Sequence, residues 1–139
     1  MSVATILIMM SVLVKNPETV HDAKAIAELI AARAGDSHEA AILVELAWRE
    51  SAFTANAISK DGRDLCAYQL RDAPRSVLKD LSQCTDLAIV RLRTSVKACP
   101  SAPLAIYASG SCRSPIGREF NRWRSREIAK IEKTVTAKD

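Results

Sequence analysis

Glu50 is the residue of this sequence whose position best suits acid chemistry. The residues three, four and seven positions before it are all apolar: Ala47, Leu46 and Leu43. A helix here would place the Glu50 carboxyl on an apolar stripe at the helix C-terminus. Burial and the negative end of the helix dipole are both expected to raise its pKa. A carboxyl that stays protonated near neutral pH can donate its proton to a leaving group, as cleavage of a glycosidic bond requires.

Helical periodicity alone leaves a second interpretation of Glu50 open. The side chain could turn to solvent at a frayed helix end, or pair with Arg49. Glu45 serves as a comparison, because it also has apolar neighbours on the same helix and such neighbours do not by themselves identify an acid. We favour Glu50 because it lies where the helix gives way to a loop, as a residue on a cleft wall would.

The helix that carries Glu50 has clear signals in the sequence. Asp36 and Glu39 have the spacing of a capping box, which marks a helix start. Residues 40–48 are apolar on most sides, so this helix should be central and buried. From residue 51 to 72 the helical period fails, and turn formers such as Asn56 and Gly62 gather there. We therefore expect a loop or small hairpin directly after the helix.

Further helical patterns lie on both sides of this segment. Asn16 and Pro17 predict the start of a helix that ends at Gly35. After the irregular segment, helical patterns cover residues 74–81, 86–96 and 103–109. Ser114 and Pro115 open a last long helix, whose expected inner face consists of Ile116, Phe120, Trp123, Ile128 and Ile131. Trp48 and Trp123 are both interpreted as core residues.

The composition fits one globular domain that spans residues 1–139. Hydrophobic residues make up 48% of the chain and charged residues 26%, which is enough for a packed core. Aromatic residues make up only 4%, so the core must be mainly aliphatic. The net charge of +4 suits an anionic polymer such as nucleic acid or bacterial cell wall, without choosing between them. The predicted fold is mainly α, with orthogonal helices and a small irregular or β lobe.

Four cysteines, at positions 66, 84, 99 and 112, predict two disulfides and an oxidising compartment. The alternative is four buried thiols in a cytosolic protein. No pair has C-x-x-C spacing and only two histidines are present, so we expect no metal site. Of the three connectivities, we favour Cys84–Cys99, at the ends of one predicted helix and its neighbour, which leaves Cys66–Cys112.

The N-terminal segment, residues 1–15, is almost entirely apolar from Val3 to Val14. This run is too short to span a bilayer as a helix, so we expect no transmembrane span. No lysine or arginine precedes the run, which makes it a poor signal peptide. We interpret it as a buried N-terminal element or as a surface that docks on a partner.

Three stretches of the chain, taken in order, resemble one group of proteins. They are Glu50-Ser51-Ala52-Phe53 followed by Ala57 and Ser59, then Cys66-Ala67-Tyr68-Gln69-Leu70, then Ala105-Ile106-Tyr107-Ala108-Ser109-Gly110. In order and rough spacing they are similar to the E-S-x-F, G-L-M-Q-like and A-Y-N-A-G-like stretches of lytic transglycosylases and goose-type lysozymes. The resemblance covers about residues 25–125.

The resemblance implies a lysozyme-like α+β fold, extracytoplasmic peptidoglycan as substrate, and neither cofactor nor metal. It places the catalytic acid at Glu50, Gln69 on the cleft floor, and Tyr107 facing the acid to orient it. Residues implied to bind substrate are Ser51, Phe53, Tyr68, Gln69, Tyr107 and Gly110. The chain departs from the pattern at Cys66 for Gly, Tyr68 for Met, Ala108 for Asn and Ser109 for Ala. A Cys66–Cys112 disulfide would tie two cleft walls together.

Two mechanisms follow from this resemblance. In a lytic transglycosylase, Glu50 alone would protonate the bond between N-acetylmuramic acid and N-acetylglucosamine, then assist attack by the muramoyl 6-hydroxyl. In a hydrolytic lysozyme, a second carboxylate is needed, and Asp61 and Asp64 are the candidates. The alternative, which we favour for both aspartates, is that they are turn formers. We favour the single-acid mechanism.

A function of another class is a non-catalytic basic module, because the last helix carries many arginines and lysines. These alternate with Glu119, Glu127 and Glu132, which is typical of a solvated face, and disulfides suit a cytosolic DNA binder poorly. We therefore expect no nucleic-acid partner. Disulfides without a convincing signal peptide favour an extracytoplasmic setting, and a phage particle within it. The apolar N-terminus would then contact other virion or secretion-machine proteins.

Overall fold

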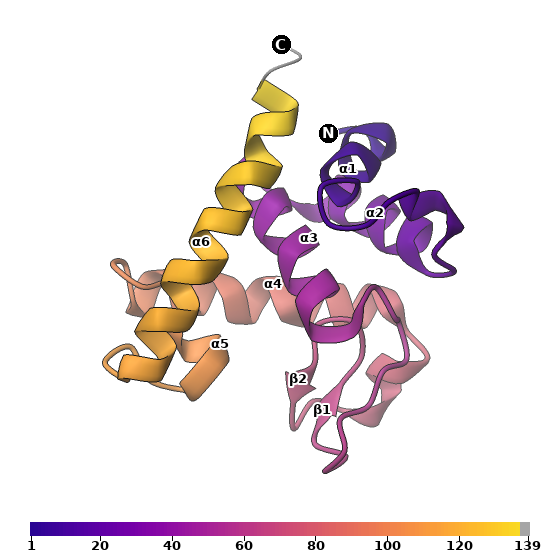
Figure 1. The fold of residues 1–139 in the computed structure, drawn as a ribbon. Coiled ribbons are helices and arrows are strands. Elements are labelled where there is room, and N and C mark those ends of the chain that lie inside the picture. The colour runs from indigo at the N-terminus through magenta and orange to yellow at the C-terminus, as the bar shows by residue number, and fades with distance from the viewer. Residues whose placement is uncertain (137–139) are drawn as a thin grey trace.

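The computed structural model describes residues 1–136, apart from the side chains of Ala108 and Ser109. Helix α3 runs through the middle of the molecule, with α1 and α2 on one side and the long helix α6 on the other (Figure 1). The prediction of a mainly α fold with a small β element is confirmed. In chain order the elements are α1 Val3–Met10, a 3-10 turn Pro17–Thr19, α2 Ala23–Arg33, α3 Ser37–Ser51, β1 Asp64–Leu65, β2 Leu70–Arg71, a 3-10 turn Arg75–Leu78, α4 Leu81–Ala98, α5 Ala105–Ser109 and α6 Pro115–Thr136.

Helix α3 begins and ends much as its sequence predicts. The Asp36 side chain accepts a hydrogen bond from the Glu39 backbone N–H at 2.8 Å, and the Glu39 carboxylate accepts from the Gly35 N–H at 2.6 Å. Every residue from 40 to 47 is buried, which confirms a central helix. The helix ends at Ser51 and is followed by Ala52 and Phe53, both of which have left-handed backbone angles (φ 50° and 59°). This turn directs the chain away from the helix axis directly after Glu50.

The N-terminal segment forms a packed helix. The side chains of Ile6, Met9 and Met10 are fully buried, and α1 contacts α2, α3 and α6. The predicted helix after Asn16 is interrupted, because Asn16 adopts a left-handed angle (φ 55°) and Val20 an extended one. Of the two interpretations of the segment, these contacts favour a buried structural element. None of the helices within residues 1–136 is long and apolar enough to cross a membrane.

The segment after α3 forms a small lobe, here called the β lobe (residues 54–72). Strands β1 and β2 pair antiparallel, with Leu65 opposite Leu70 and Asp64 opposite Arg71. The connection between the strands turns sharply through Cys66 (φ 67°) and Gln69 (φ 48°). The lobe is tethered to the helices by Asp22, whose carboxylate accepts the Ala55 N–H at 2.8 Å. The predicted small hairpin is therefore confirmed.

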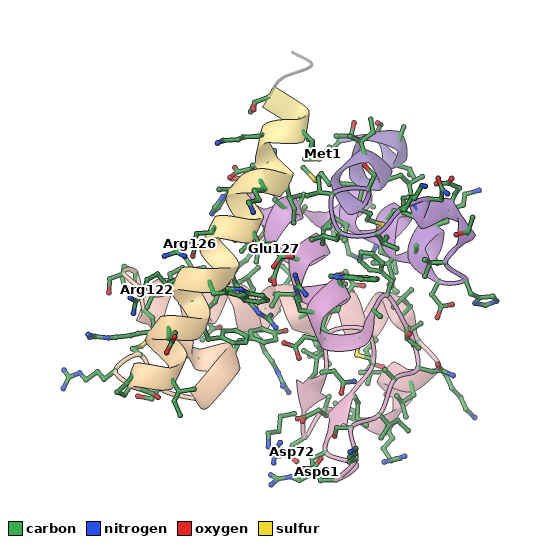
Figure 2. The ribbon with its side chains drawn as sticks, in the orientation of Figure 1. Met1, Asp61, Asp72, Arg122, Arg126 and Glu127 are labelled. Atoms are coloured by element: carbon green, nitrogen blue, oxygen red, sulfur yellow. A yellow bond between two sulfur atoms is a disulfide. The ribbon has the colours of Figure 1, made fainter. Side chains whose placement is uncertain are left out.

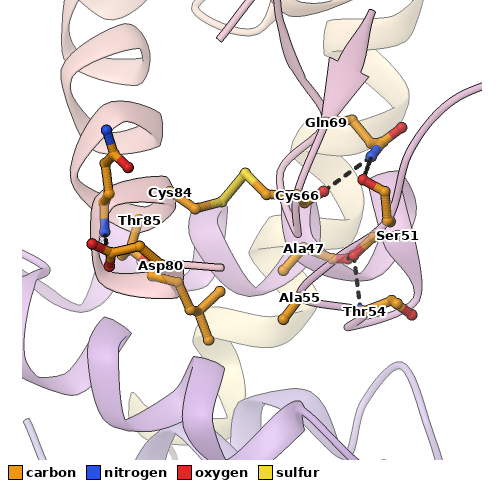
Figure 3. The surroundings of a disulfide bond; sticks show 12 residues. Ala47, Ser51, Thr54, Ala55, Cys66, Gln69, Asp80, Cys84 and Thr85 are labelled. Atoms are coloured by element: carbon orange, nitrogen blue, oxygen red, sulfur yellow. Dashed lines mark hydrogen bonds between the residues drawn. A yellow bond between two sulfur atoms is a disulfide. The ribbon is translucent and has the colours of Figure 1, made fainter. Parts of the chain in front are cut away.

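The structure contains two disulfides, as predicted, but both expected pairings are wrong. The bonds are Cys66–Cys84, with Cα atoms 6.4 Å apart, and Cys99–Cys112, with Cα atoms 5.5 Å apart. Helix α4 begins at Leu81, earlier than expected, so it contains Cys84 and ends beside Cys99. Cys99 comes fifteen positions after Cys84 along this helix, which places the two about 22 Å apart, far beyond the reach of a disulfide. Cys66–Cys84 instead fastens the β lobe to the first turns of α4 (Figure 3).

The last helix faces the core with a different set of residues than expected. Ile128 and Ile131 are buried as predicted and Phe120 is partly buried, but Ile116 is 74% exposed and Trp123 is 47% exposed. The buried face consists of Gly117, Asn121, Arg124, Ile128 and Ile131. Trp123 lies outside the core, with the Arg49 guanidinium 4.7 Å from its ring centroid. The inner face thus includes two polar residues, which a search for apolar periodicity could not find.

Candidate active site

A cleft of about 760 Å³ lies where α3, the β lobe, α4 and α5 meet. Five of the residues singled out in the sequence line it: Glu50, Asp64, Gln69, Tyr107 and Gly110. They come from α3, β1, the turn between β1 and β2, α5 and the residue that follows α5. Other lining residues come from β2, α4 and α5, namely Leu70, Arg71, Val90, Arg91, Thr94, Ser95 and Ile106. The fold therefore gathers the central residue of each motif around one opening.

Glu50 lies in the last turn of α3, and its side chain is 23% exposed. Burial raises the pKa of this carboxyl, the Arg124 guanidinium opposes that effect, and the negative charge of Asp64 adds to it. Arg124 Nη2 donates a hydrogen bond to Glu50 Oε1 at 2.8 Å. The net result is a carboxyl with a raised pKa at the wall of a cleft. One of its two oxygens is fixed by the hydrogen bond from Arg124.

Tyr107 approaches the cleft from α5. Its hydroxyl is buried and has no hydrogen-bond partner among the described residues. Burial raises the pKa of this phenol, and the charge of Glu50 raises it further, so the hydroxyl stays protonated. Asn121 fixes the start of α5, because its side-chain oxygen accepts the Leu104 N–H at 2.8 Å. The Tyr107 hydroxyl can thus still donate and accept a hydrogen bond close to Glu50, and the helix that carries it is fixed at its start.

Gln69 contributes to the cleft from the turn between β1 and β2. Its side-chain amide nitrogen donates to the carbonyl oxygens of Ala57 at 3.1 Å and Cys66 at 3.0 Å. Figure 3 shows this amide beside the Cys66–Cys84 disulfide. The amide nitrogen therefore holds the turn in place, and the side-chain oxygen is the part of Gln69 that remains for a ligand.

Three residues implied to bind substrate do not line the cleft. Ser51 donates its hydroxyl to the Ala47 carbonyl and accepts the Thr54 N–H, each at 3.0 Å, which closes the end of α3. Phe53 is 1% exposed, with its ring centroid 5.3 Å from that of Trp48, and Tyr68 is fully buried. Because Phe53 and Tyr68 are buried and the Ser51 hydroxyl is bonded within its own helix end, we assign these three residues to the support of the cleft wall.

The two candidate second carboxylates occupy different places. Asp64 lines the cleft and pairs with Arg71, whose Nη1 lies 3.2 and 3.3 Å from the two carboxylate oxygens. Asp61 lies at the far tip of the β lobe (Figure 2), where it accepts hydrogen bonds from the Ser59 hydroxyl at 2.7 Å and the Arg63 N–H at 3.1 Å. Asp61 is thus a turn former, and Asp64 is the one of the two beside the acid.

Sequence reasoning missed two arginines of this site. Arg91 lines the cleft from α4, and within the described part of the chain no carboxylate forms an ion pair with it. Arg124 was counted among the solvated cations of the last helix, but it is 4% exposed. On the same helix Arg122 and Arg126 do point outward, away from α3 (Figure 2). No sequence signal separates Arg124 from them, except its spacing from Ile128 and Ile131.

Arg124 joins Glu50 to a second buried carboxyl, and we call these three residues the Glu–Arg–Glu cluster. Arg124 Nε lies 3.3 Å from Oε1 of Glu45, whose side chain is fully buried. Burial raises the pKa of Glu45 to about 7, although Arg124 lowers it. The guanidinium carbon lies 3.9 Å from the ring centroid of Phe120, so this ring packs against the cation.

Comparisons with protein-family models, curated proteins and solved structures found no match to this chain. Within residues 1–136, no group of three or more His, Cys, Asp or Glu side chains has the arrangement of a metal site. The cleft itself offers four chemical groups: a carboxyl with a raised pKa, a phenol, an amide oxygen and a cation.

Proposed function

We propose that this protein cleaves the β-1,4 bond between N-acetylmuramic acid and N-acetylglucosamine in bacterial peptidoglycan, as a lytic transglycosylase with a lysozyme-like fold. The observation that carries the proposal is the meeting of Glu50, Gln69 and Tyr107 at one cleft. Each is the central residue of a separate motif of the resembling families. The turn at Cys66 adds support, because its left-handed angle (φ 67°) is one that favours glycine, and those families carry glycine there.

The reaction follows from a single acid. Protonated Glu50 donates its proton to the glycosidic oxygen as the bond from that oxygen to the anomeric carbon breaks. The resulting carboxylate then takes the proton of the muramoyl 6-hydroxyl, whose oxygen forms a new bond to the anomeric carbon. The products are an anhydro sugar and a free 4-hydroxyl, and no water is consumed. Glu50 ends the cycle protonated again.

The other lining residues have roles that match this substrate. The Tyr107 hydroxyl, unpartnered and beside the acid, would hydrogen-bond the carboxylate formed during the reaction. The Gln69 side-chain oxygen would accept from a sugar N–H or O–H. Arg91, a cation without an ion pair in the described chain, would face a carboxylate of the lactyl group or the stem peptide. Two disulfides suit an extracytoplasmic setting, such as a periplasm or a phage particle.

The test is mass spectrometry of purified cell-wall sacculi after digestion. We expect products that end in anhydromuramic acid, and Glu50→Gln (E50Q) should lower their rate of formation by about 10²–10⁴-fold. Glu132→Gln (E132Q) is the matched control, because it removes a carboxylate of α6 that pairs with His38 outside the cleft. A folded wild-type protein that releases no products would reject the proposal, and salt-dependent retention on DNA would then favour a basic binding module.

A hydrolytic lysozyme mechanism is the second candidate, because Asp64 lines the same cleft and its charge acts on Glu50. In that mechanism Asp64 would position or activate water, and the products would end in reducing muramic acid. Asp64→Asn distinguishes the two. It should abolish activity if Asp64 is the second carboxylate, and should leave the formation of anhydro products within a few-fold of wild type if Glu50 acts alone.

A further inference from the structure

The Glu–Arg–Glu cluster places one cation between two carboxyls in a region that water hardly reaches. Arg124 is 4% exposed and Glu45 is fully buried, so neither is a surface group. Glu45 accepts no hydrogen bond from the described residues, and the Arg124 guanidinium, 3.3 Å from Oε1, is the cation in contact with it. The same guanidinium donates to Glu50 at 2.8 Å. One positive charge therefore serves two acids from two different turns of α3.

This arrangement has a clear consequence for protonation. If both carboxyls were ionised, the cluster would carry a net negative charge in surroundings of low polarity, which is costly. Burial, with a smaller contribution from the charge of Glu50, raises the pKa of Glu45 to about 7, so Glu45 is a carboxyl that holds its proton up to that pH. Whichever carboxyl is ionised draws on the charge of Arg124, and the other then holds its proton more firmly.

Other charged groups around the cluster are few. Glu50 also feels Asp64 from β1, and it acts on Tyr107 from α5, on which Arg91 of α4 acts as well. Glu45 feels Glu127 from α6 and Arg49 from its own helix. The buried residues of α1 and α2, on the other side of α3, are all apolar. Of these groups, Arg124 is the one that touches both carboxyls.

We propose that Glu45 and Arg124 are positioning residues for Glu50. Arg124 holds Oε1 of Glu50 and stabilises the carboxylate left after proton donation. Glu45 keeps its proton up to about pH 7, so below that pH the charge of Arg124 is left to Glu50, and above it Glu45 draws on the same guanidinium. Without Arg124, the carboxylate formed in the reaction would lose its counter-charge. The catalytic part of this proposal rests on the proposed function.

The decisive measurement is the titration of Glu45, followed by NMR through its side-chain carboxyl carbon and assigned by comparison with Glu45→Gln (E45Q). E50Q has nearly the same shape as the native side chain and removes a charge that raises the pKa of Glu45, so it should lower that pKa by about half a pH unit or more. E132Q, the same change outside the cluster, should leave it in place. A Glu45 titration that is unchanged in E50Q would overturn the proposal, whether or not the protein cleaves cell wall.

Kinetics test the catalytic part. Arg124→Lys keeps the charge but cannot reach both carboxyls as a guanidinium does, and it should lower kcat about tenfold with little change in KM. An unchanged kcat in Arg124→Lys would overturn the role of Arg124. If no variant or wild type cleaves wall but the NMR shift is observed, the proposed function fails and the coupling stands.

Discussion

The two sides of the cleft are held by different means. The β lobe is fastened by Cys66–Cys84, whose two cysteines are fully buried, and by the Gln69 amide on two carbonyl oxygens. The opposite side, here called the α5 corner (residues 99–114), is held by Cys99–Cys112 and by Asn121 on the Leu104 N–H. Each side presents one neutral polar side chain to the cleft, Gln69 or Tyr107.

These two side chains differ in how much of their hydrogen bonding the protein itself uses. Gln69 donates twice to its own loop, whereas the Tyr107 hydroxyl has no partner among the described residues. A group bound to its own fold contributes mainly stability, and an unpartnered buried group is available to a reaction. The comparison therefore predicts that damage to the β lobe affects folding first, and damage to the α5 corner affects activity first.

Removal of the disulfides tests this difference most strongly. The C66A/C84A variant should lose about 3 kcal/mol of unfolding free energy from loop closure, and somewhat more because both cysteines are buried. The C99A/C112A variant lacks a disulfide that closes a loop of similar length, 13 residues against 18. Because Cys112 is partly exposed, this variant should lose less unfolding free energy. Urea unfolding measures both. A larger loss in C99A/C112A would contradict the comparison.

The acid between the two sides should make stability depend on pH. The pKa of Glu45 is about 7 in the folded protein and near 4.5 in the unfolded chain, so the folded state binds this proton more tightly. The contribution of Glu45 to the unfolding free energy should be complete below about pH 4.5, and up to about 3 kcal/mol of it should be lost as the pH rises to 7. In E45Q that loss should vanish. Equal slopes in both proteins, measured by denaturation at several pH values, would exclude it.

Gln69→Leu tests the β-lobe side directly. The change removes two hydrogen bonds to carbonyl oxygens and should lower the unfolding free energy by about 1–3 kcal/mol. The folded fraction of the variant should keep its cleft. The fall in kcat, expressed as a free energy, should therefore be smaller than the loss of unfolding free energy. Thermal unfolding beside wall-digestion rates gives both values. A fully stable variant would show that the turn does not need this amide.

Tyr107→Phe tests the α5 side. Its hydroxyl has no partner, so stability should be equal to or above that of the wild type, while kcat should fall about tenfold, equivalent to about 1.4 kcal/mol. The same two assays apply. If this variant lost stability but kept its rate, the two sides would have the reverse of the roles assigned to them.

Much of the fold could be predicted because its signals are local. The Asp36 cap, the apolar run of α3 and the turn formers after it each act within a few residues, and the structure has all three features. The disulfide pairing could not be predicted, because it depends on where α4 starts, and a shift of five residues there changes which cysteines meet. The predicted inner face of the last helix was wrong because the buried face includes two polar residues, Asn121 and Arg124.

The candidate site was predictable only in part. The motifs indicated Glu50, Gln69 and Tyr107, and these side chains line one cleft. Arg124 could not be found, because its partners lie 74 and 79 positions away and nothing local marks it as buried. Glu45 was set aside as a residue whose apolar neighbours proved little. Its burial is real, and its significance depends on the cation that reaches it from α6.

Helix α6 also connects the acid to the helix that carries Tyr107. Asn121 accepts a hydrogen bond at the start of α5, and Arg124, three positions further along the same helix, donates one to the acid. These two attachment points are about 4.5 Å apart along the helix axis, less than one turn. Glu50 itself lies on α3 and Tyr107 on α5, so a shift of α6 would change both hydrogen bonds at once, the one to the acid and the one at the start of the tyrosine's helix.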